Sequence, residues 1–288
     1  MSERMQKFRP LALALIVLVA ALPCSALAAW PDDLRVVTYN IHHGEGIDKK
    51  FDLERIAKVM LAEKPDIVAV QEVDQKTRRA SGVDQPAELA RLTRMKVVFG
   101  RNIDFEGGGY GTAVLTNIPV RSSESLKLKS YYAPTKENAE QRGVQILELG
   151  AKDRPGLTFM CTHLDYRPPD DERMNSALTV NELVRKRPNQ PTVIAGDFNA
   201  LPDSRVIREF AKEWKIAGME LEGAEQRPRK DDGKTKAILT IPVEKPERWI
   251  DYVMCRPAKH WEVKEVRVLD EAVASDHRAL VAVLKYVP

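Results

Sequence analysis

The sequence predicts an α/β protein in which two packed β-sheets carry helices on their outer faces. Strand-like stretches rich in Val and Ile alternate with amphipathic helices, and the strands clearly outnumber the helices. The stretch at 66–73 is apolar on both faces, which indicates a buried strand. Because no internal repeat, low-complexity tract or interdomain linker interrupts residues 30–288, we expect a single domain there.

Residues 1–29 are predicted to be a secretory signal peptide outside the folded domain. A basic start precedes an apolar stretch at 11–22, and small residues at cleavage spacing follow it. The apolar stretch is too short to cross a bilayer comfortably, and an uncleaved N-terminal anchor is the alternative interpretation. We therefore expect cleavage after Ala28 or Ala29 and a secreted or periplasmic protein.

The composition does not favour a surface built for polynucleotides. The formal net charge of +3 becomes +1 once the three basic residues and one acidic residue of the leader are removed. Proteins that depend on contacts to a polynucleotide backbone are often strongly basic, so a dedicated nuclease is less expected but not excluded. Cys24 leaves with the leader, while Cys161 and Cys255 lie in apolar strand-like runs, where we expect buried free thiols, with a disulfide between them in an oxidising compartment as the alternative.

The chain begins with a strand, helix, strand unit of parallel type. Strands are predicted at 34–41 and 66–73, and Asp52 is placed to cap the helix between them. One face of this helix is apolar and consists of Leu53, Ile56, Ala57 and Met60.

The remaining elements follow from the same patterns. Residues 220–248 are polar and include a basic cluster at 227–236. We expect a long surface loop there, either a solvated connection or a determinant of specificity. In chain order, we expect strands at 112–116, 144–149 and 157–163, a helix at 171–187, a strand at 192–195, a helix capped by Asp203, and strands at 249–255, 263–268 and 278–286.

Polar side chains that can bind metal or phosphate stand where the predicted strands end or begin. A parallel or mixed sheet delivers strand ends to one edge, so such residues can meet around one ion or one phosphate. Four of the 5 histidines are placed in this way. The residues concerned are Asn40, His42, His43, Glu72, His163, Asp197, Asn199, Asp251, Asp276 and His277.

Three of these residues are predicted metal ligands. Glu72 follows a buried strand, where a carboxylate is costly unless it pairs with a basic residue or coordinates a cation. A salt bridge with a nearby arginine is the alternative for Glu72. Asn40, at the end of the preceding parallel strand, offers a neutral oxygen, and Asp276 can reach the same ion. Oxygen ligands of this kind suit Mg²⁺, with Mn²⁺ as the second choice.

The other polar residues suit chemistry at phosphorus. Asp197 can orient or deprotonate an attacking water and Asn199 can donate to a phosphate oxygen, although Asp-x-Asn is also a common turn. Asp251 is expected to fix the tautomer of His163, and a buried ion pair with an arginine is its alternative. His277 is expected to face the phosphate.

Eight segments that carry these residues resemble, in order, the motifs of the endonuclease/exonuclease/phosphatase superfamily. That superfamily includes pancreatic-type deoxyribonuclease, abasic-site endonucleases, neutral sphingomyelinases and inositol-phosphate 5-phosphatases. The resemblance covers essentially all of the chain after the leader. The segments are VVTYNIHHG, PDIVAVQEVD, GYGTAVLT, QRG, THLDYR, AGDFNA, TIPVEKPERWIDYV and SDHRALVAVL.

The resemblance implies a four-layer α/β sandwich with a Mg²⁺-dependent phosphoesterase site at one edge. It assigns metal binding to Asn40, Glu72 and Asp276, and it assigns a phosphate contact to His163, with Asp251 orienting that ring. Asp197 and Asn199 match the water-activating and phosphate-binding pair, His277 matches the general base or transition-state donor, and Arg142 matches an arginine near the phosphate. Whether Asp197 or His277 takes the proton stays open.

Two departures from the family pattern lie at the rim of the expected site. Thr112 stands where many members have Asn, and Ile241-Pro242-Val243 replaces a more usual Phe-Pro-Ser. Both leave the chemistry intact and put the substrate in doubt.

The sequence therefore predicts an exported, metal-dependent phosphodiesterase in which water attacks a phosphate ester in line. The ester belongs to a small molecule, a nucleic acid or a lipid head group, and a monomer without an obligate protein partner is expected. An extracellular nuclease would use the basic cluster at 227–236. A sphingomyelinase-like enzyme would use exposed aromatic loop tips, for which Tyr131 and Tyr132 are the candidates. A non-catalytic binding protein on the same fold is disfavoured, because none of the expected site residues is missing.

Overall fold

A computed structural model of the chain describes residues 30–130, 139–151, 156–223, 225–229 and 237–288. The predicted signal peptide lies outside the described residues, as do Tyr131, Tyr132 and the residues 230–236 of the basic cluster. None of the helices in the described part of the chain is long and apolar enough to cross a bilayer.

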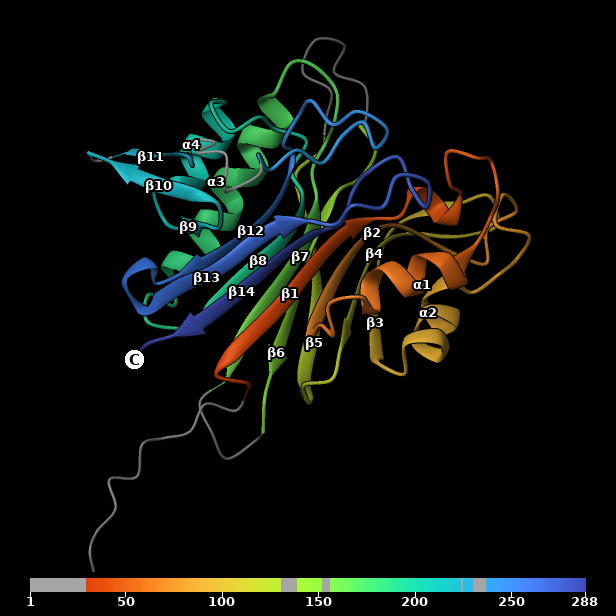
Figure 1. The fold of residues 1–288 in the computed structure, drawn as a ribbon, viewed down its shortest axis with the longest axis horizontal. Coiled ribbons are helices and arrows are strands. Elements are labelled where there is room, and N and C mark those ends of the chain that lie inside the picture. Colours follow the sequence, from red (N-terminus) through yellow and green to blue (C-terminus); the bar gives the residue numbers. More distant parts are fainter. Residues whose placement is uncertain (1–29, 131–138, 152–155, 224, 230–236) are drawn as a thin grey trace, which may run out of the picture.

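Two mixed six-stranded sheets form the centre of the structure (Figure 1). The first sheet has the order β13 (Trp261–Val268), β14 (Leu280–Tyr286), β1 (Asp33–Asn40), β2 (Ile67–Gln75), β4 (Gly108–Thr116), β3 (Lys96–Phe105). The second has the order β5 (Val120–Lys127), β6 (Gly143–Leu149), β7 (Leu157–His163), β8 (Thr192–Asp197), β12 (Asp251–Arg256), β9 (Lys215–Ile216). The central pairs β1–β2 and β7–β8 are parallel, and their neighbours join them antiparallel.

Helices cover the outer faces of both sheets, which gives the four layers that the resemblance implies (Figure 1). Helices α1 (Leu53–Leu61) and α2 (Gln85–Thr93) share an apolar cluster with the first sheet. Helices α3 (Asp171–Arg185) and α4 (Arg205–Ala211) share a second cluster with the other sheet. A third cluster, drawn from both sheets, fills the space between them. The predicted fold class is therefore confirmed, with helices on opposite sides of two stacked sheets.

The helix starts test two capping predictions. Asp52 accepts a hydrogen bond from the backbone N–H of Arg55, so the predicted cap of α1 is confirmed. The predicted cap of α4, Asp203, is wrong by one residue, because the helix begins at Arg205 and Ser204 Oγ accepts from the N–H of Ile207. The residue directly before the first helical one occupies the capping position, and here a serine fills it.

The structure also contains elements that the sequence patterns did not predict. Strands β3 and β5 lie at the outer edges of their sheets. The exposed polar residues of β5 leave it without an apolar run, whereas β3 has the run Val97-Val98-Phe99, a strand signal that was not used. Helix α2 is short and begins with Pro86 in its first turn. The predicted surface loop at 220–248 begins instead with the hairpin β10 (Met219–Glu222)–β11 (Glu225–Pro228).

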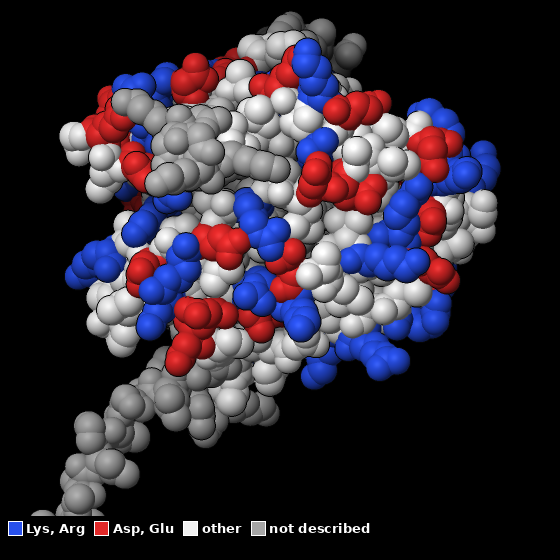
Figure 2. All heavy atoms as spheres, in the orientation of Figure 1, with Lys and Arg blue, Asp and Glu red and all other residues white. Residues whose placement is uncertain are grey.

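The described arginines of the basic cluster are already paired with acids. Arg227 lies 2.5 Å from Glu225 and Arg229 lies 2.9 Å from Glu220. On the face shown in Figure 2, basic and acidic side chains are interspersed in the same way. The two predicted free thiols, Cys161 and Cys255, are indeed unpaired and buried.

The corrected cap gives a matched test of the α4 start. We expect Ser204→Ala to lower the free energy of unfolding by about 1 kcal/mol, because one backbone donor of the helix loses its partner. Asp203→Ala, one residue earlier, is the control and should change it by less than about 0.5 kcal/mol. Urea unfolding of both variants measures this, and an equal loss in the control would contradict the assignment.

Candidate functional site

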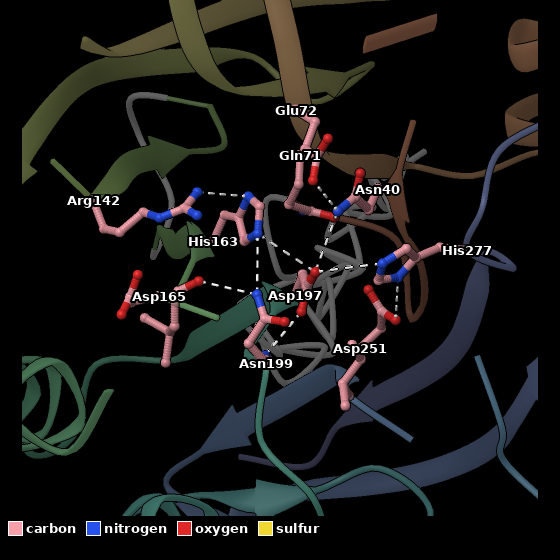
Figure 3. A network of polar contacts seen from close by, with 12 residues as sticks. Asn40, Gln71, Glu72, Arg142, His163, Asp165, Asp197, Asn199, Asp251 and His277 are labelled. Carbon is pink, nitrogen blue, oxygen red and sulfur yellow. Dashed lines mark hydrogen bonds and ion pairs between the residues drawn. The ribbon is translucent and has the colours of Figure 1, made fainter. Parts of the chain in front are cut away.

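The predicted site residues lie at one edge of the sandwich because of the direction of the strands (Figure 3). The parallel strands β1, β2, β7 and β8 deliver their carboxyl ends to this edge. Strands β12 and β14 run antiparallel to their neighbours and therefore begin there. This edge brings together Asn40, Glu72, Arg142, His163, Asp197, Asn199, Asp251 and His277.

Asn40 connects the two sheets at this edge. Its Nδ2 donates to Glu72 Oε1 at 3.0 Å and to Asp197 Oδ2 at 3.2 Å, so a side chain from β1 holds carboxylates from β2 and β8. Its Oδ1, the predicted metal ligand, accepts from the backbone N–H of His42 at 3.0 Å. In this orientation Asn40 positions two carboxylates with its nitrogen, and its oxygen holds the following turn.

Glu72 occupies a β-bulge that turns its side chain toward the edge. The register between β2 and β4 shifts between Val70 and Val73, so that two residues of β2 lie opposite Thr112 alone. The backbone of Glu72 has a φ of 59°, in the left-handed region that few non-glycine residues adopt. Bulges of this kind re-aim side chains beside active sites. The rim departure at Thr112 therefore lies directly across from the predicted metal ligand.

Asp251 pairs with His277 and not with His163. Its Oδ2 lies 2.9 Å from Nδ1 of His277. The other ring nitrogen of His277, Nε2, lies 3.7 Å from Asp197 Oδ2. The prediction that Asp251 orients His163 is wrong because β8 lies between β7, which carries His163, and β12, which carries Asp251. The alternative of an ion pair between Asp251 and an arginine is not seen among the described residues.

His163 has a different environment. Arg142 Nη1 lies 3.0 Å from its Nδ1, and Asn199 Nδ2 lies 3.2 Å from its Nε2. Asn199 also donates from Nδ2 to the carbonyl oxygen of Leu164 at 3.1 Å. Its backbone N–H donates to Asp197 Oδ1 at 2.8 Å, which forms the expected Asp-x-Asn turn within the site.

The charges of the central residues depend on burial and on their neighbours. Burial and the repulsion of Asp251 raise the pKa of Asp197 to about 7. Burial lowers the pKa of His277, but the carboxylates of Asp251, Asp197 and Asp276 outweigh it and raise that pKa to about 10. Burial and the positive charge of Arg142 hold the pKa of His163 well below its usual value. One imidazole is therefore kept charged and the other neutral.

The acidic residues of the edge fit a divalent cation. In the described part of the chain, Glu72, Asp197, Asp251 and Asp276 make no ion pair with a lysine or arginine. The alternative salt bridge of Glu72 is thus not observed. Ligand atoms of Asp197, Asp251 and His277 lie within 4.8 Å of one another. Asp197 and Asp251 are buried and Glu72 and Asp276 are half-buried, so the cluster needs positive charge beyond the single imidazolium, which suits a hard metal ion.

Two contributors to the edge escaped the sequence analysis. Glu140 Oε1 lies 2.9 Å from Arg142 Nη1 and holds that guanidinium in place. Ser275 Oγ donates to the backbone oxygen of Asn40 at 2.7 Å and contacts Asp276 Oδ1 at 3.3 Å. The position of an acid two residues before Arg142 was the one available signal for Glu140. Asp276 reaches the network through Ser275.

Comparison with known proteins identifies the family. The model of the Endonuclease/Exonuclease/phosphatase family matches residues 37–277, most of the chain. The chain belongs to this family. Members of the endonuclease/exonuclease/phosphatase family hydrolyse phosphoester bonds, often with a metal ion, and the match includes every predicted site residue.

The chain is also similar to a protein of known sequence and to several solved structures. The uncharacterized protein YbhP of Escherichia coli K12 is 27% identical over 179 residues, which cover 57% of this chain and 66% of that protein. A family member from Beutenbergia cavernae has a TM-score of 0.67 at 23% identity, over 89% of this chain and 72% of its own. The Bacteroides thetaiotaomicron mannosyl-6-phosphatase Bt3783 has a TM-score of 0.66 at 18% identity, over 88% of this chain and 100% of its own. The human Nocturnin catalytic domain with bound sulfate has a TM-score of 0.65 at 20% identity, over 90% and 96%. At these identities the solved structures support the endonuclease/exonuclease/phosphatase fold alone.

The lowered pKa of His163 predicts a measurable loss of stability in acid. Below about pH 6.5 this histidine binds a proton in the unfolded state but not in the folded state. The free energy of unfolding therefore falls by about 1.4 kcal/mol per pH unit because of this group. His163→Gln removes the effect. Urea unfolding in chelator should therefore show that the free energy of unfolding falls less in the variant than in the wild type between pH 8 and pH 5. A constant difference between the two proteins would contradict a neutral His163.

Proposed function

We propose that this protein is an exported, Mg²⁺-dependent phosphodiesterase that directs water in line onto a phosphate ester. One observation supports it above all: four carboxylates gather at a strand edge without a lysine or arginine partner among the described residues, beside neutral donors suited to phosphate. Acids of this kind suit a metal, and donors of this kind suit a tetrahedral anion. The fold relative Nocturnin was solved with a bound sulfate, an anion of the same shape.

The expected metal ligands are Glu72 and Asp276, with Asn40 holding Glu72 in place. Mg²⁺ at these residues, or Mn²⁺ in its place, would polarise a phosphoryl oxygen and offset charge on the leaving oxygen. Asp197 lies beside this position and receives the proton of the attacking water, because His277, which its neighbouring acids keep protonated, has no free ring nitrogen to accept it. The bond from water to phosphorus forms as the bond to the leaving oxygen breaks.

The charge of the phosphate pocket favours a diester over a monoester. Asn199 and His163 offer neutral N–H donors, and Arg142 stands behind His163 with Glu140 already paired to it. A phosphate diester carries one negative charge, whereas a monoester carries close to two at neutral pH. Apart from the expected metal ion and the imidazolium of His277, the described residues bring no unpaired positive charge to the pocket, which suits the monoanion. Hydrolysis of a monoester, the chemistry that the name of the Bacteroides neighbour describes, is the second candidate.

The described part of the basic cluster gives a polynucleotide little to bind. Arg227 and Arg229, two members of the basic cluster, are each neutralised by a glutamate. A nuclease needs unpaired basic residues along its groove, since counterion release supplies most of the binding free energy. We therefore place small phosphodiesters before nucleic acids, with the lipid head group as a further outcome of the test below.

The metal assignment can be tested with bis-p-nitrophenyl phosphate. Hydrolysis should require Mg²⁺ or Mn²⁺ and stop in chelator. Glu72→Gln should lower it by about a hundredfold or more, because the amide removes a charged ligand without changing the shape. Glu124→Gln, at an exposed position of β5, is the matched control. Full activity in chelator would rule out the metal.

A substrate panel separates the candidate functions. With Mg²⁺ present, we expect hydrolysis of bis-p-nitrophenyl phosphate to exceed that of p-nitrophenyl phosphate by about tenfold or more. Plasmid DNA, RNA and sphingomyelin should be poorer substrates. A preference for the monoester would replace the diesterase assignment, and an inert protein across the whole panel would favour the binding-protein alternative.

Export can be tested on the full chain expressed in a bacterium. The protein from the periplasm or the medium should begin at Ala29 or Trp30 when its N-terminus is sequenced. A version starting at Trp30 after an initiator Met is the control and should stay in the cytoplasm. An intact N-terminus in the membrane fraction would instead support the anchor interpretation.

A further inference from the structure

The contact between Arg142 and His163 determines what His163 can do. Arg142 Nη1 lies 3.0 Å from His163 Nδ1, and both side chains are buried. A guanidinium has only N–H donors and does not lose its proton in a protein. Nδ1 must therefore accept this hydrogen bond with its lone pair. A neutral imidazole has one ring proton, so that proton lies on Nε2.

Further contacts fix the position of the Arg142 guanidinium beside His163. Glu140 Oε1 lies 2.9 Å from the same Nη1 atom and forms an ion pair with it, without the geometry of a hydrogen bond. The backbone N–H of Arg142 donates to Ser130 Oγ at 3.2 Å, and its carbonyl oxygen accepts from the N–H of Leu128 at 2.9 Å. The guanidinium is thus fixed on the side of His163 that is remote from Asn199 (Figure 3).

The Nε2–H points toward a place where another donor already converges. Asn199 Nδ2 lies 3.2 Å from Nε2, and its donation to the Leu164 carbonyl oxygen fixes which end of the amide is nitrogen. Asp197 Oδ2 lies 3.5 Å from Nε2, beyond an ordinary hydrogen bond. The second N–H of Asn199 and the Nε2–H of His163 thus face each other, and two donors so placed are suited to share an oxygen of an anionic ligand.

We propose that Arg142 acts as a positioning residue that locks His163 as the neutral Nε2–H tautomer, so that His163 donates a hydrogen bond to a non-bridging phosphate oxygen and never protonates the leaving group. This rests on the proposed phosphoesterase function. It replaces the expectation that Arg142 itself contacts the phosphate. If a neutral His163 gave up its only ring proton, it would become an imidazolate anion beside Asp197. His163 is therefore not the acid of the reaction, and the leaving oxygen takes its proton from water after it has departed.

The tautomer can be measured without any activity. In the full mature protein labelled with ¹⁵N-histidine, long-range ¹H–¹⁵N NMR at pH 7 distinguishes the protonated nitrogen of each ring. The signals of His163 are those missing from His163→Gln. We expect protonation at Nε2 alone. Protonation at Nδ1, or at both nitrogens, would overturn the lock even if the enzyme proves to be a phosphodiesterase. A neutral Nε2–H ring in a protein without hydrolase activity would instead refute the proposed function alone.

The kinetic role is tested by two substitutions of the same histidine. Glutamine places an amide N–H near the position of Nε2, so His163→Gln should retain activity within about tenfold, whereas His163→Ala should lose about a hundredfold or more. Aryl phosphodiesters with leaving phenols of increasing pKa then identify the role. The loss in His163→Ala should be the same for each, within about threefold. A loss that grows with leaving-group basicity would show general acid catalysis and overturn the proposal.

A double-mutant cycle asks whether Arg142 acts through His163. Arg142→Met removes the donor at similar length, and adding it to His163→Ala should cost less than about threefold more activity, because the residue it orients is already gone. A further loss of tenfold or more would show a direct contact between Arg142 and the phosphate. If Arg142→Met fails to fold, judged by its circular dichroism and melting, the NMR and glutamine experiments still decide the matter, since both leave Arg142 and Glu140 intact.

Discussion

The structure depends on the contacts that surround one buried carboxylate, Asp197. It accepts hydrogen bonds from the Asn40 side chain and the Asn199 backbone, and both imidazoles of the edge lie within 4 Å of it. Asn40 belongs to the first sheet and Asp197 to the second, so these contacts also join the sheets. A carboxylate removed from water is costly unless such partners replace its hydration. The arrangement is therefore stable only when both sheets deliver their strand ends together.

The rest of the fold supplies what this edge requires. Three apolar clusters, one between the sheets and one under each pair of helices, hold the strands in a fixed register. That packing also supports strained backbone at the edge, where Glu72 and Asn199 both have positive φ. Strain of this kind persists only where the surrounding structure determines it. Gly196, directly before Asp197, shows how tight the packing is, since a Cβ there would lie 2.0 Å from the Thr162 carbonyl oxygen.

The identity of the site residues was predictable from the sequence, but their pairing was not. Asn40, His163 and Asp197 end strands with clear apolar patterns, Glu72 follows the apolar run of β2 at a bulge within that strand, and parallel strands share one edge. Whether Asp251 meets His163 or His277 depends on the order of strands, which periodicity does not encode. The bulge that aims Glu72 and the serine that caps α4 depend on single residues of register. The edge strand β5 could not be predicted because its exposed polar residues leave no apolar run, whereas the run Val97-Val98-Phe99 did offer a signal for β3.

The two imidazoles of the edge show how one residue type can serve two purposes. His277 lies between Asp251 and Asp197, and these acids keep it protonated despite its burial. His163 lies between Arg142 and Asn199, and burial beside a fixed cation keeps it neutral. If Asp251 and Arg142 exchanged places, the charge states of the two imidazoles would be exchanged as well. The residue behind each ring therefore matters as much as the ring, and a match of the histidines alone does not establish what either one does.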